Sequence, residues 1–326
     1  DGIDTVGKKM TVCDLYAKQI RHHGNVRHNT TKGRERLMKL LEADKLGSCP
    51  IDSVKPSDAK EWALRMKEKG MSYKTISNDK RSLKAAFYTA IQDDCIRKNP
   101  FDFQLNTVIK DDTEPKVPLT AKQEESLLSF MQSDSVYRKY RDEVIILLGT
   151  GLRVSELCGL TETDLDFEER VIHVDHQLLR SAETGYYIEK PKTQSGIRQI
   201  PMSKKVYEAL GRVLKNRRGA KTATVDGYSN FLFLNRNGFP KTAASYDSMF
   251  RGLAEKYNKS HEEALPRVMT PHTLRHTFCT NLANAGMNPK ALQYIMGHSN
   301  ITMTLNYYAH ATFASARAEM ERLIAV

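Results

Sequence analysis

A segment with three prolines and a run of acidic residues interrupts the sequence about a third of the way along the chain. The prolines lie within residues 99–118, and Asp-Asp-Thr-Glu at 111–114 supplies the acidic run. The segment has no helical or strand periodicity, which is typical of a connection between domains. A single hydrophobic core rarely organises more than roughly 250–300 residues, so a chain of 326 residues is expected to contain two domains. The predicted organisation is a first domain at 1–110, a linker at 111–118 and a second domain at 119–326.

The composition is that of a globular protein without a membrane span. Hydrophobic residues make up 40% of the sequence and charged residues 27%, which is too apolar for a disordered chain. No apolar run is long enough for a transmembrane helix, so no membrane partner is expected. The five cysteines are scattered without a Cys-x-x-Cys pair, which argues against a disulfide scaffold and predicts a reducing, cytoplasmic location. The absence of an initial methionine predicts a fragment of a longer protein.

The net charge is the most informative part of the composition. Fifty lysines and arginines against 39 acidic residues give +11, and the excess is spread over both predicted domains. A polyanion such as nucleic acid is a natural partner, because each neutralised phosphate releases counterions. A basic but otherwise ordinary enzyme is the alternative.

Apolar periodicity predicts a bundle of four helices in the first domain. Thr11 and Asp14 resemble a capping box before the first helix, and Pro56 precedes the third, which Gly70 is expected to end. The fourth helix has an apolar stripe and one basic face. A basic face is most often a solvated surface, but it also suits contact with DNA phosphates. The candidate DNA-binding residues on this face are Lys74, Lys80, Arg81 and Lys84.

The second domain mixes helices with a few short strands. Capping residues predict helix starts at Thr120, at Thr270-Pro271 and at Asn288-Pro289. Glycine turns separate the apolar stretches between the helices. The predicted strands are 171–174, 186–188, 198–200 and, as one more possibility, 231–234. The fold class expected from the whole pattern is mainly α with a small antiparallel β-sheet.

Two motifs place cations at turns. Arg153 follows a Gly-Thr-Gly turn where a helix begins, and Glu156 lies one helical turn later, where it could hold the guanidinium. An ordinary surface ion pair is the alternative interpretation. Lys192 is expected at a hairpin tip, from which its ammonium could reach a neighbouring cleft, although charged turns are common.

Two further motifs lie in the helical part of the domain. His272 and Arg275 share one face at a helix start, which suits a phosphate. A Gly-His-Ser segment contains His298, and Tyr307 and Tyr308 follow it. Two tyrosines near a chain end are normally packing residues, so each motif alone is a weak signal.

Taken together and in this order, the four motifs resemble those of the tyrosine recombinase (phage-type integrase) family. The match covers the whole second domain and, more loosely, the first domain, where Asn99-Pro100-Phe101 is similar to the family pattern. The start of the chain is most similar to integrases of conjugative transposons, which carry an additional amino-terminal arm-binding domain. The resemblance implies a helical core-binding bundle followed by an α+β tyrosine-recombinase catalytic domain. It also implies a site-specific recombinase that inserts and excises a mobile element.

The resemblance implies that a set of basic residues and one tyrosine act on a scissile phosphodiester. Two guanidiniums can clamp the nonbridging oxygens as charge develops, so no metal is expected. The tyrosine would attack phosphorus and form a 3′-phosphotyrosine, which conserves the bond energy, so no ATP and no other cofactor is expected. The implied catalytic residues are Arg153, Lys192, His272, Arg275, His298 and Tyr308.

The resemblance also implies individual roles. Lys192 would protonate the departing 5′ oxygen, His272 would act as base or hydrogen-bond partner, and His298 would bond a phosphate oxygen. Glu156 would orient its neighbours. The nucleophile in the family commonly stands two residues before a histidine, which favours Tyr308; the spacing from His298 leaves Tyr307 open.

The implied partners are double-stranded DNA, at transposon ends and target, and further copies of the chain. Apolar residues at helical spacing in 312–326 predict an amphipathic C-terminal helix. It could pack on its own domain; the resemblance implies instead that it is exchanged between the subunits of a homotetramer.

Three rival interpretations remain at this point. A non-catalytic DNA-binding regulator would need neither Lys192 nor the tyrosines. A metal-dependent hydrolase could use His272 and His276, but the glutamate of a His-Glu-x-x-His motif is missing. A type IB topoisomerase would share the catalytic groups.

Overall fold

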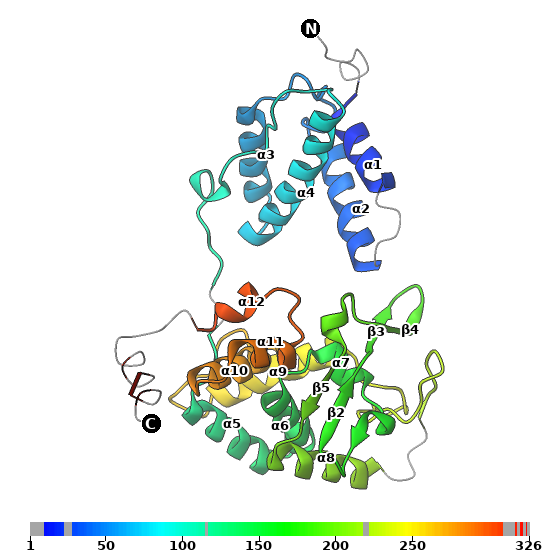
Figure 1. The fold of residues 1–326 in the computed structure, drawn as a ribbon. Coiled ribbons are helices and arrows are strands. Elements are labelled where there is room, and N and C mark those ends of the chain that lie inside the picture. Colours follow the sequence, from blue (N-terminus) through cyan, green and yellow to red (C-terminus); the bar gives the residue numbers. More distant parts are fainter. Residues whose placement is uncertain are drawn as a thin grey trace. The chain divides into compact units, whose positions relative to one another are not determined.

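The computed structural model describes residues 10–22, 28–114, 117–217 and 222–308, together with 317, 320, 321 and 324. The chain forms two compact units, Asp1–Pro115 and Lys116–Val326, each with its own hydrophobic core (Figure 1). None of the helices in the described ranges is long and apolar enough to cross a membrane.

The first unit is built from helices whose starts follow the sequence signals. The side chains of Thr11 and Asp14 each accept from the other's backbone N–H, which confirms the predicted capping box before α1. Pro56 is the first residue of α3, and Gly70, with φ +82°, follows its end. The helices are α1 Val12–His22, α2 His28–Glu42, α3 Pro56–Glu68 and α4 Tyr73–Gln92, followed by the short 3₁₀ helix η1 Leu105–Thr107.

An aromatic cluster forms the centre of the first unit. Trp62 of α3 meets Phe101 edge to face with ring centroids 5.8 Å apart, and Phe87 of α4 also packs on Phe101, with centroids 5.3 Å apart. All three side chains are fully buried. Residues 111–114, in the predicted linker, have no regular structure, but Asp112 accepts a hydrogen bond from Lys67 and so stays with this unit.

The second unit packs helices around two small sheets. Thr120 and Gln123 form the predicted capping box of α5, and Asn288 caps α11 by accepting from Lys290 and Ala291. The helices are α5 Ala121–Ser133, α6 Arg141–Thr150, α7 Val154–Gly159, α8 Lys204–Arg217, α9 Ala243–Asn258, α10 Pro271–Asn284, α11 Pro289–Met296 and α12 Thr302–Leu305. Helix α6 contributes four consecutive buried residues, 144–147, to the core of this unit.

Both sheets are antiparallel, and the predicted fold class is confirmed. The three-stranded sheet has the order β1-β2-β5, from Leu165–Asp166, Val171–Val174 and Arg198–Pro201. The two-stranded sheet pairs β3 Gln177–Ser181 with β4 Gly185–Glu189. Strands β1 and β3 were not predicted, because β1 has only two residues and β3 lacks an alternating pattern over its full length.

Two predictions about strands are wrong. Strand β4 pairs with β3 and β5 pairs with β2, so Lys192 lies in a connection between two sheets and not at a hairpin tip. Residues 231–234 form only isolated bridges, from Phe231 to Thr161 and from Leu234 to Pro240. The apolar run in this segment indicates burial, since Phe231, Leu232 and Phe233 are all in the core. An apolar run alone does not specify a sheet partner.

We expect Phe101→Ala to lower the free energy of unfolding of the first unit by about 3–5 kcal/mol, because it leaves a cavity beside Trp62. Phe103→Ala is the matched control, since Phe103 is only partly buried and packs at the edge of the same core. Urea unfolding followed by the fluorescence of Trp62, the single tryptophan, measures both. Equal losses for the two variants would contradict the assignment of Phe101 to the centre of the core.

Candidate active site

The turn between α6 and α7 presents Arg153. Helix α6 ends at Thr150, and Gly151 continues with φ +62°, where a Cβ would meet the ring of Phe278 at 2.4 Å. Arg153 precedes α7 in an extended conformation, and its backbone N–H donates to Oε2 of Glu156 at 2.8 Å. The guanidinium also donates to Oε1 of Glu156 at 2.7 Å, while 38% of the side chain stays exposed. The predicted contact between Arg153 and Glu156 is therefore present, and it is partly accessible.

Arg275, on α10, is the second predicted arginine, and it is buried. Its Nη1 donates to the carbonyl of Gly151 at 2.5 Å, and its Nη2 donates to the carbonyl of Met296. Burial and the nearby charge of Arg153 lower the pKa of Arg275 to about 9. The guanidinium is still positively charged at neutral pH, and a neighbouring anion would stabilise that charge.

The sequence interpretation missed a third arginine, Arg198 on β5. Its side chain is fully buried and binds Glu156 with both terminal nitrogens, at 3.0 and 2.8 Å. Its Nε donates to the carbonyl of Ile295 at 2.6 Å. The alternation of buried and exposed residues along β5 could have revealed Arg198. This arginine lies on the same buried face as Ile200, and a buried guanidinium requires a carboxylate partner.

Glu156 is the single carboxylate shared by this arginine cluster, which we define as Arg153, Arg198 and Arg275. Burial alone would raise the pKa of Glu156, but hydrogen bonds from Arg198 and the charges of all three arginines lower it to about 2. The carboxylate is ionised at neutral pH. One negative charge therefore faces three positive charges, and the cluster keeps a net positive charge.

The C-terminal end of α11 provides the remaining acceptors for the same three arginines. The carbonyls of Ile295, Met296 and Gly297 accept from Arg198, Arg275 and Arg153 respectively. The last carbonyls of a helix have no partner within the helix and lie at its negative end, so they suit cations. The hydrogen bonds of the three arginines thus connect α7, β5, α10 and α11 at one point of the second unit.

His298 follows directly after this helix end and is buried. Its Nδ1 shares a hydrogen bond with the hydroxyl of Thr304 at 2.9 Å. Burial, together with the charges of the arginine cluster and His272, lowers the pKa of His298 to about 4. The imidazole is therefore neutral at pH 7, and it can bond an oxygen without adding charge.

The other two predicted basic residues are less enclosed. His272 is exposed in the first turn of α10, and its charge contributes to lowering the pKa of His298. Lys192 is exposed in the segment between β4 and the 3₁₀ helix η4, Gln194–Gly196. No ion pair or hydrogen bond joins Lys192 to the arginine cluster in the described part of the chain.

The two candidate tyrosines differ in their surroundings. The ring of Tyr307 packs on His276 with centroids 4.9 Å apart. Burial and Cys279 raise the pKa of Tyr307, and the charge of Arg275 acts in the opposite direction. The hydroxyl of Tyr308 instead donates to the carbonyl of Met287, and burial followed by Cys279 raises its pKa without a contribution from Arg275. Tyr307 is thus the tyrosine whose pKa is influenced by the arginine cluster.

Several other predicted features can be located only in part. His310 and most of 312–326, including the predicted C-terminal helix, lie outside the described residues. The one grouping of possible metal ligands in the described ranges is Asp164, Asp175 and His176, which contains neither histidine of the rival metal interpretation.

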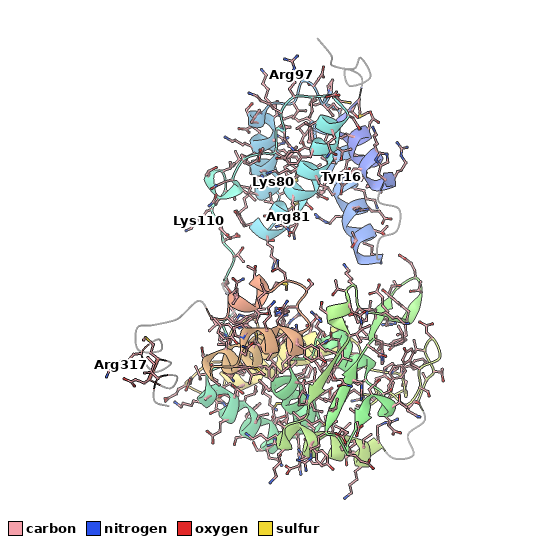
Figure 2. All side chains as sticks on the ribbon, in the orientation of Figure 1. Tyr16, Lys80, Arg81, Arg97, Lys110 and Arg317 are labelled. Atoms are coloured by element: carbon pink, nitrogen blue, oxygen red, sulfur yellow. The ribbon has the colours of Figure 1, made fainter. Side chains whose placement is uncertain are left out.

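The predicted DNA-binding residues belong to α4 of the first unit, and Figure 2 labels two of them, Lys80 and Arg81. Lys74 and Arg81 are exposed. Lys80 lies over the ring of Phe103 at 4.5 Å, and Lys84 pairs with Asp102 at 2.5 Å. Two of the four cations are therefore held by neighbours within the unit.

The family of the chain follows from comparison with known proteins. The profile of the phage integrase family matches residues 118–315, and the chain belongs to this family of tyrosine recombinases. The transposase from transposon Tn916 of Enterococcus faecalis is 65% identical over 323 residues, which cover 99% of this chain and 80% of that protein. The predicted resemblance to tyrosine recombinases of conjugative transposons is confirmed.

Solved structures agree with this result. The Tn1549 transposon integrase, in complex with a circular intermediate DNA and with an arginine-to-lysine substitution, is 76% identical with a TM-score of 0.92. The alignment covers 96% of this chain and 99% of that chain. The same integrase with a tyrosine-to-phenylalanine substitution, in complex with transposon right end DNA, has a TM-score of 0.91 at 76% identity, covering 97% and 100%.

We expect Gly297→Ala to destabilise the second unit more than Gly286→Ala. Both glycines have positive φ, +61° and +79°, so both variants carry a backbone cost of about 1–2 kcal/mol. A Cβ at Gly286 meets open space, whereas one at Gly297 would lie 3.1–3.2 Å from Arg198 and from the carbonyl of Ser195. Crowding should add about 1–3 kcal/mol. Thermal unfolding measures the difference, and equal losses would show that α11 does not pack tightly on Arg198.

We expect the stability that Glu156 contributes to depend on pH. Its pKa is about 2 in the folded chain against 4.5 for an unperturbed glutamate, so the contribution is complete above about pH 4.5 and declines as the pH falls towards 2. Glu156→Gln should cost about 3–5 kcal/mol at pH 6 and less as the pH is lowered. Urea unfolding by circular dichroism at several pH values tests this, with the exposed Glu125→Gln as control. A difference that does not change with pH would refute the role of the ionised carboxylate.

Proposed function

We propose that this chain is a site-specific DNA recombinase that cuts and rejoins strands through a 3′-phosphotyrosyl intermediate and thereby inserts and excises a conjugative transposon. The observation that carries the proposal is the arginine cluster, in which one buried carboxylate and one helix end hold three guanidiniums. This net positive site needs an anion to balance it. A phosphodiester gains negative charge in its transition state, so the site suits phosphoryl transfer.

Arg153 and Arg275 are the groups that we propose bind the nonbridging oxygens of the scissile phosphate. Each uses only part of its five N–H donors within the protein, and Arg153 is partly exposed. Their contacts with Glu156, Gly151 and the end of α11 fix both guanidiniums before substrate binds. Such preorganisation lowers the cost of stabilising charge in the transition state.

Tyr307 is the nucleophile that we now favour over Tyr308. Its pKa is influenced by Arg275, whereas the hydroxyl of Tyr308 is bonded to the carbonyl of Met287. A relative supports the same choice: the substituted arginine and tyrosine of the Tn1549 integrase lie 154 residues apart, as do Arg153 and Tyr307. With Tyr308 the separation would be one residue longer.

Three further residues complete the proposed chemistry. As the phenolic oxygen of Tyr307 attacks phosphorus, His272 accepts its proton, and Lys192 gives a proton to the leaving 5′ oxygen. His298, neutral at pH 7, hydrogen-bonds a nonbridging oxygen. The phosphotyrosine keeps the energy of the broken bond, so a 5′-hydroxyl can reverse the reaction without ATP.

We also propose how the whole protein engages DNA. The first unit is the core-binding domain and the second the catalytic domain, and the basic face of α4, with Lys74, Lys80, Arg81 and Lys84, contacts phosphates. The substrate is double-stranded DNA at the transposon ends and at the target, which is supported by the DNA in the Tn1549 integrase complexes. Four copies assemble on two duplexes and exchange their C-terminal helices. A DNA substrate and five cysteines that form no disulfide both suit a cytoplasmic location.

We expect Tyr307→Phe to abolish covalent adduct formation and Tyr308→Phe to retain it within about tenfold, because only the first removes the attacking oxygen. The assay incubates each variant with a nicked duplex of the Tn1549 transposon right end, in the presence of a chelator, and detects a denaturation-resistant protein–DNA adduct. Retained adduct in Tyr307→Phe together with loss in Tyr308→Phe would reverse the choice. Cleavage that needs a divalent cation and leaves no adduct in the unmodified chain would overturn the proposed function.

A further inference from the structure

Arg198 contacts three segments of the second unit from a fully buried position. Its terminal nitrogens bind both oxygens of Glu156, and its Nε binds the carbonyl of Ile295 at the end of α11. A third contact comes from Nη1, which also donates to the carbonyl of Gly196 at 3.1 Å. The same guanidinium therefore joins the arginine cluster to the segment that follows Lys192.

The segment that carries Lys192, residues 190–196, is closed tightly at its base. Gly196 is buried against Pro191, and a Cβ at Gly196 would lie 2.3 Å from the Cβ of that proline. The backbone N–H of Gly196 donates to the carbonyl of Thr193 at 2.9 Å. The residues on both sides of Lys192 thus contact Gly196. Arg198 fixes this base by donating a hydrogen bond to the carbonyl of Gly196. Lys192 itself extends from the closed base into solvent.

The end of α11 covers the same base from another direction. A Cβ on Gly297 would lie 3.1 Å from the carbonyl of Ser195 and 3.1 Å from Nη1 of Arg198. The hydroxyl of Tyr294 accepts from the backbone N–H of Gln199, the residue after Arg198. The helix end that binds all three arginines is therefore packed on the base of the Lys192 segment as well.

We propose that Arg198 is a positioning residue that sets where Lys192 delivers its proton, by fixing the base of the segment 190–196 on the arginine cluster. The proposal rests on the role of Lys192 as general acid in the proposed function. In the step concerned, the Tyr307 oxygen forms a bond to phosphorus and its proton passes to His272. The bond from phosphorus to the 5′ oxygen breaks, and a proton moves from Nζ of Lys192 to that oxygen. Arg198 touches none of the reacting atoms.

A leaving group that needs no proton separates this role from a purely structural one. When sulfur replaces the bridging 5′ oxygen of the scissile phosphate, the product is a stable thiolate, and a defect in proton delivery no longer slows cleavage. A defect in binding the nonbridging oxygens persists with sulfur. The assay compares single-turnover cleavage of two nicked Tn1549 right-end duplexes, one with oxygen and one with sulfur at this position.

Two variants disturb the base of the segment from opposite sides. Arg198→Lys keeps a charge beside Glu156 but loses the bond to Gly196 or to Ile295, since an ammonium cannot reproduce the planar set of contacts. Gly196→Ala leaves every buried charge in place and pushes Pro191 aside. Gly196→Ala keeps the test valid if Arg198→Lys fails to fold. Circular dichroism measures whether each variant is folded. Lys192→Ala and Arg153→Ala serve as references for proton delivery and for phosphate binding.

The expected result is a shared pattern for three variants. Lys192→Ala, Arg198→Lys and Gly196→Ala should each lower cleavage of the oxygen substrate by at least about 10²-fold and cleave the sulfur substrate within about tenfold of the unmodified chain. Arg153→Ala should be slow on both substrates. If sulfur rescues Lys192→Ala but neither of the folded base variants, Arg198 does not act through Lys192 and the inference fails. If sulfur does not rescue Lys192→Ala, Lys192 is not the general acid, and the inference about Arg198 fails as well.

Discussion

One buried carboxylate shared by three arginines is the constraint on which the second unit depends. Arg153, Arg198 and Arg275 cannot lie close together unless their repulsion is offset, and Glu156 is the only negative side chain bonded to the cluster within the described residues. The offset is incomplete, and the pKa values reflect this. The pKa of Glu156 is lowered to about 2 and that of Arg275 to about 9. The protein alone leaves this site short of negative charge, which is why we propose that it binds a phosphodiester.

A helix end completes the arrangement because carbonyl dipoles stabilise cations without adding a charge. Three consecutive residues, from Ile295 to Gly297, each give one carbonyl to a different arginine. Gly297 allows α11 to end at this point, since its φ is positive and a side chain there would crowd Arg198. The helix that carries the acceptors leads directly into His298 and the two tyrosines. The carbonyls that support the arginines and the residues proposed to react therefore share one short stretch of chain.

Much of this could be predicted from the sequence, and the failures have a common cause. The capping boxes at Thr11 and Thr120 were confirmed, and the contact of Arg153 with Glu156 was anticipated, because each is an interaction over three residues. The hairpin expected around Lys192 and the strand expected at 231–234 were wrong. Both concern which strand pairs with which, and an apolar run or a turn does not carry that information.

The sequence by itself determined several of the helix starts, the mainly helical fold class and the candidate site residues Arg153, Arg275 and His298. These follow from capping, from periodicity and from motifs, all of which act over a few residues. Only the tertiary structure decided that Arg198 joins the arginine cluster, 42 residues from Glu156 and 97 from Ile295, and that the charge of Arg275 opposes the rise in the pKa of Tyr307. The physical reason is that the strength of a charge interaction depends on distance and burial in space, and local sequence preferences set neither of these.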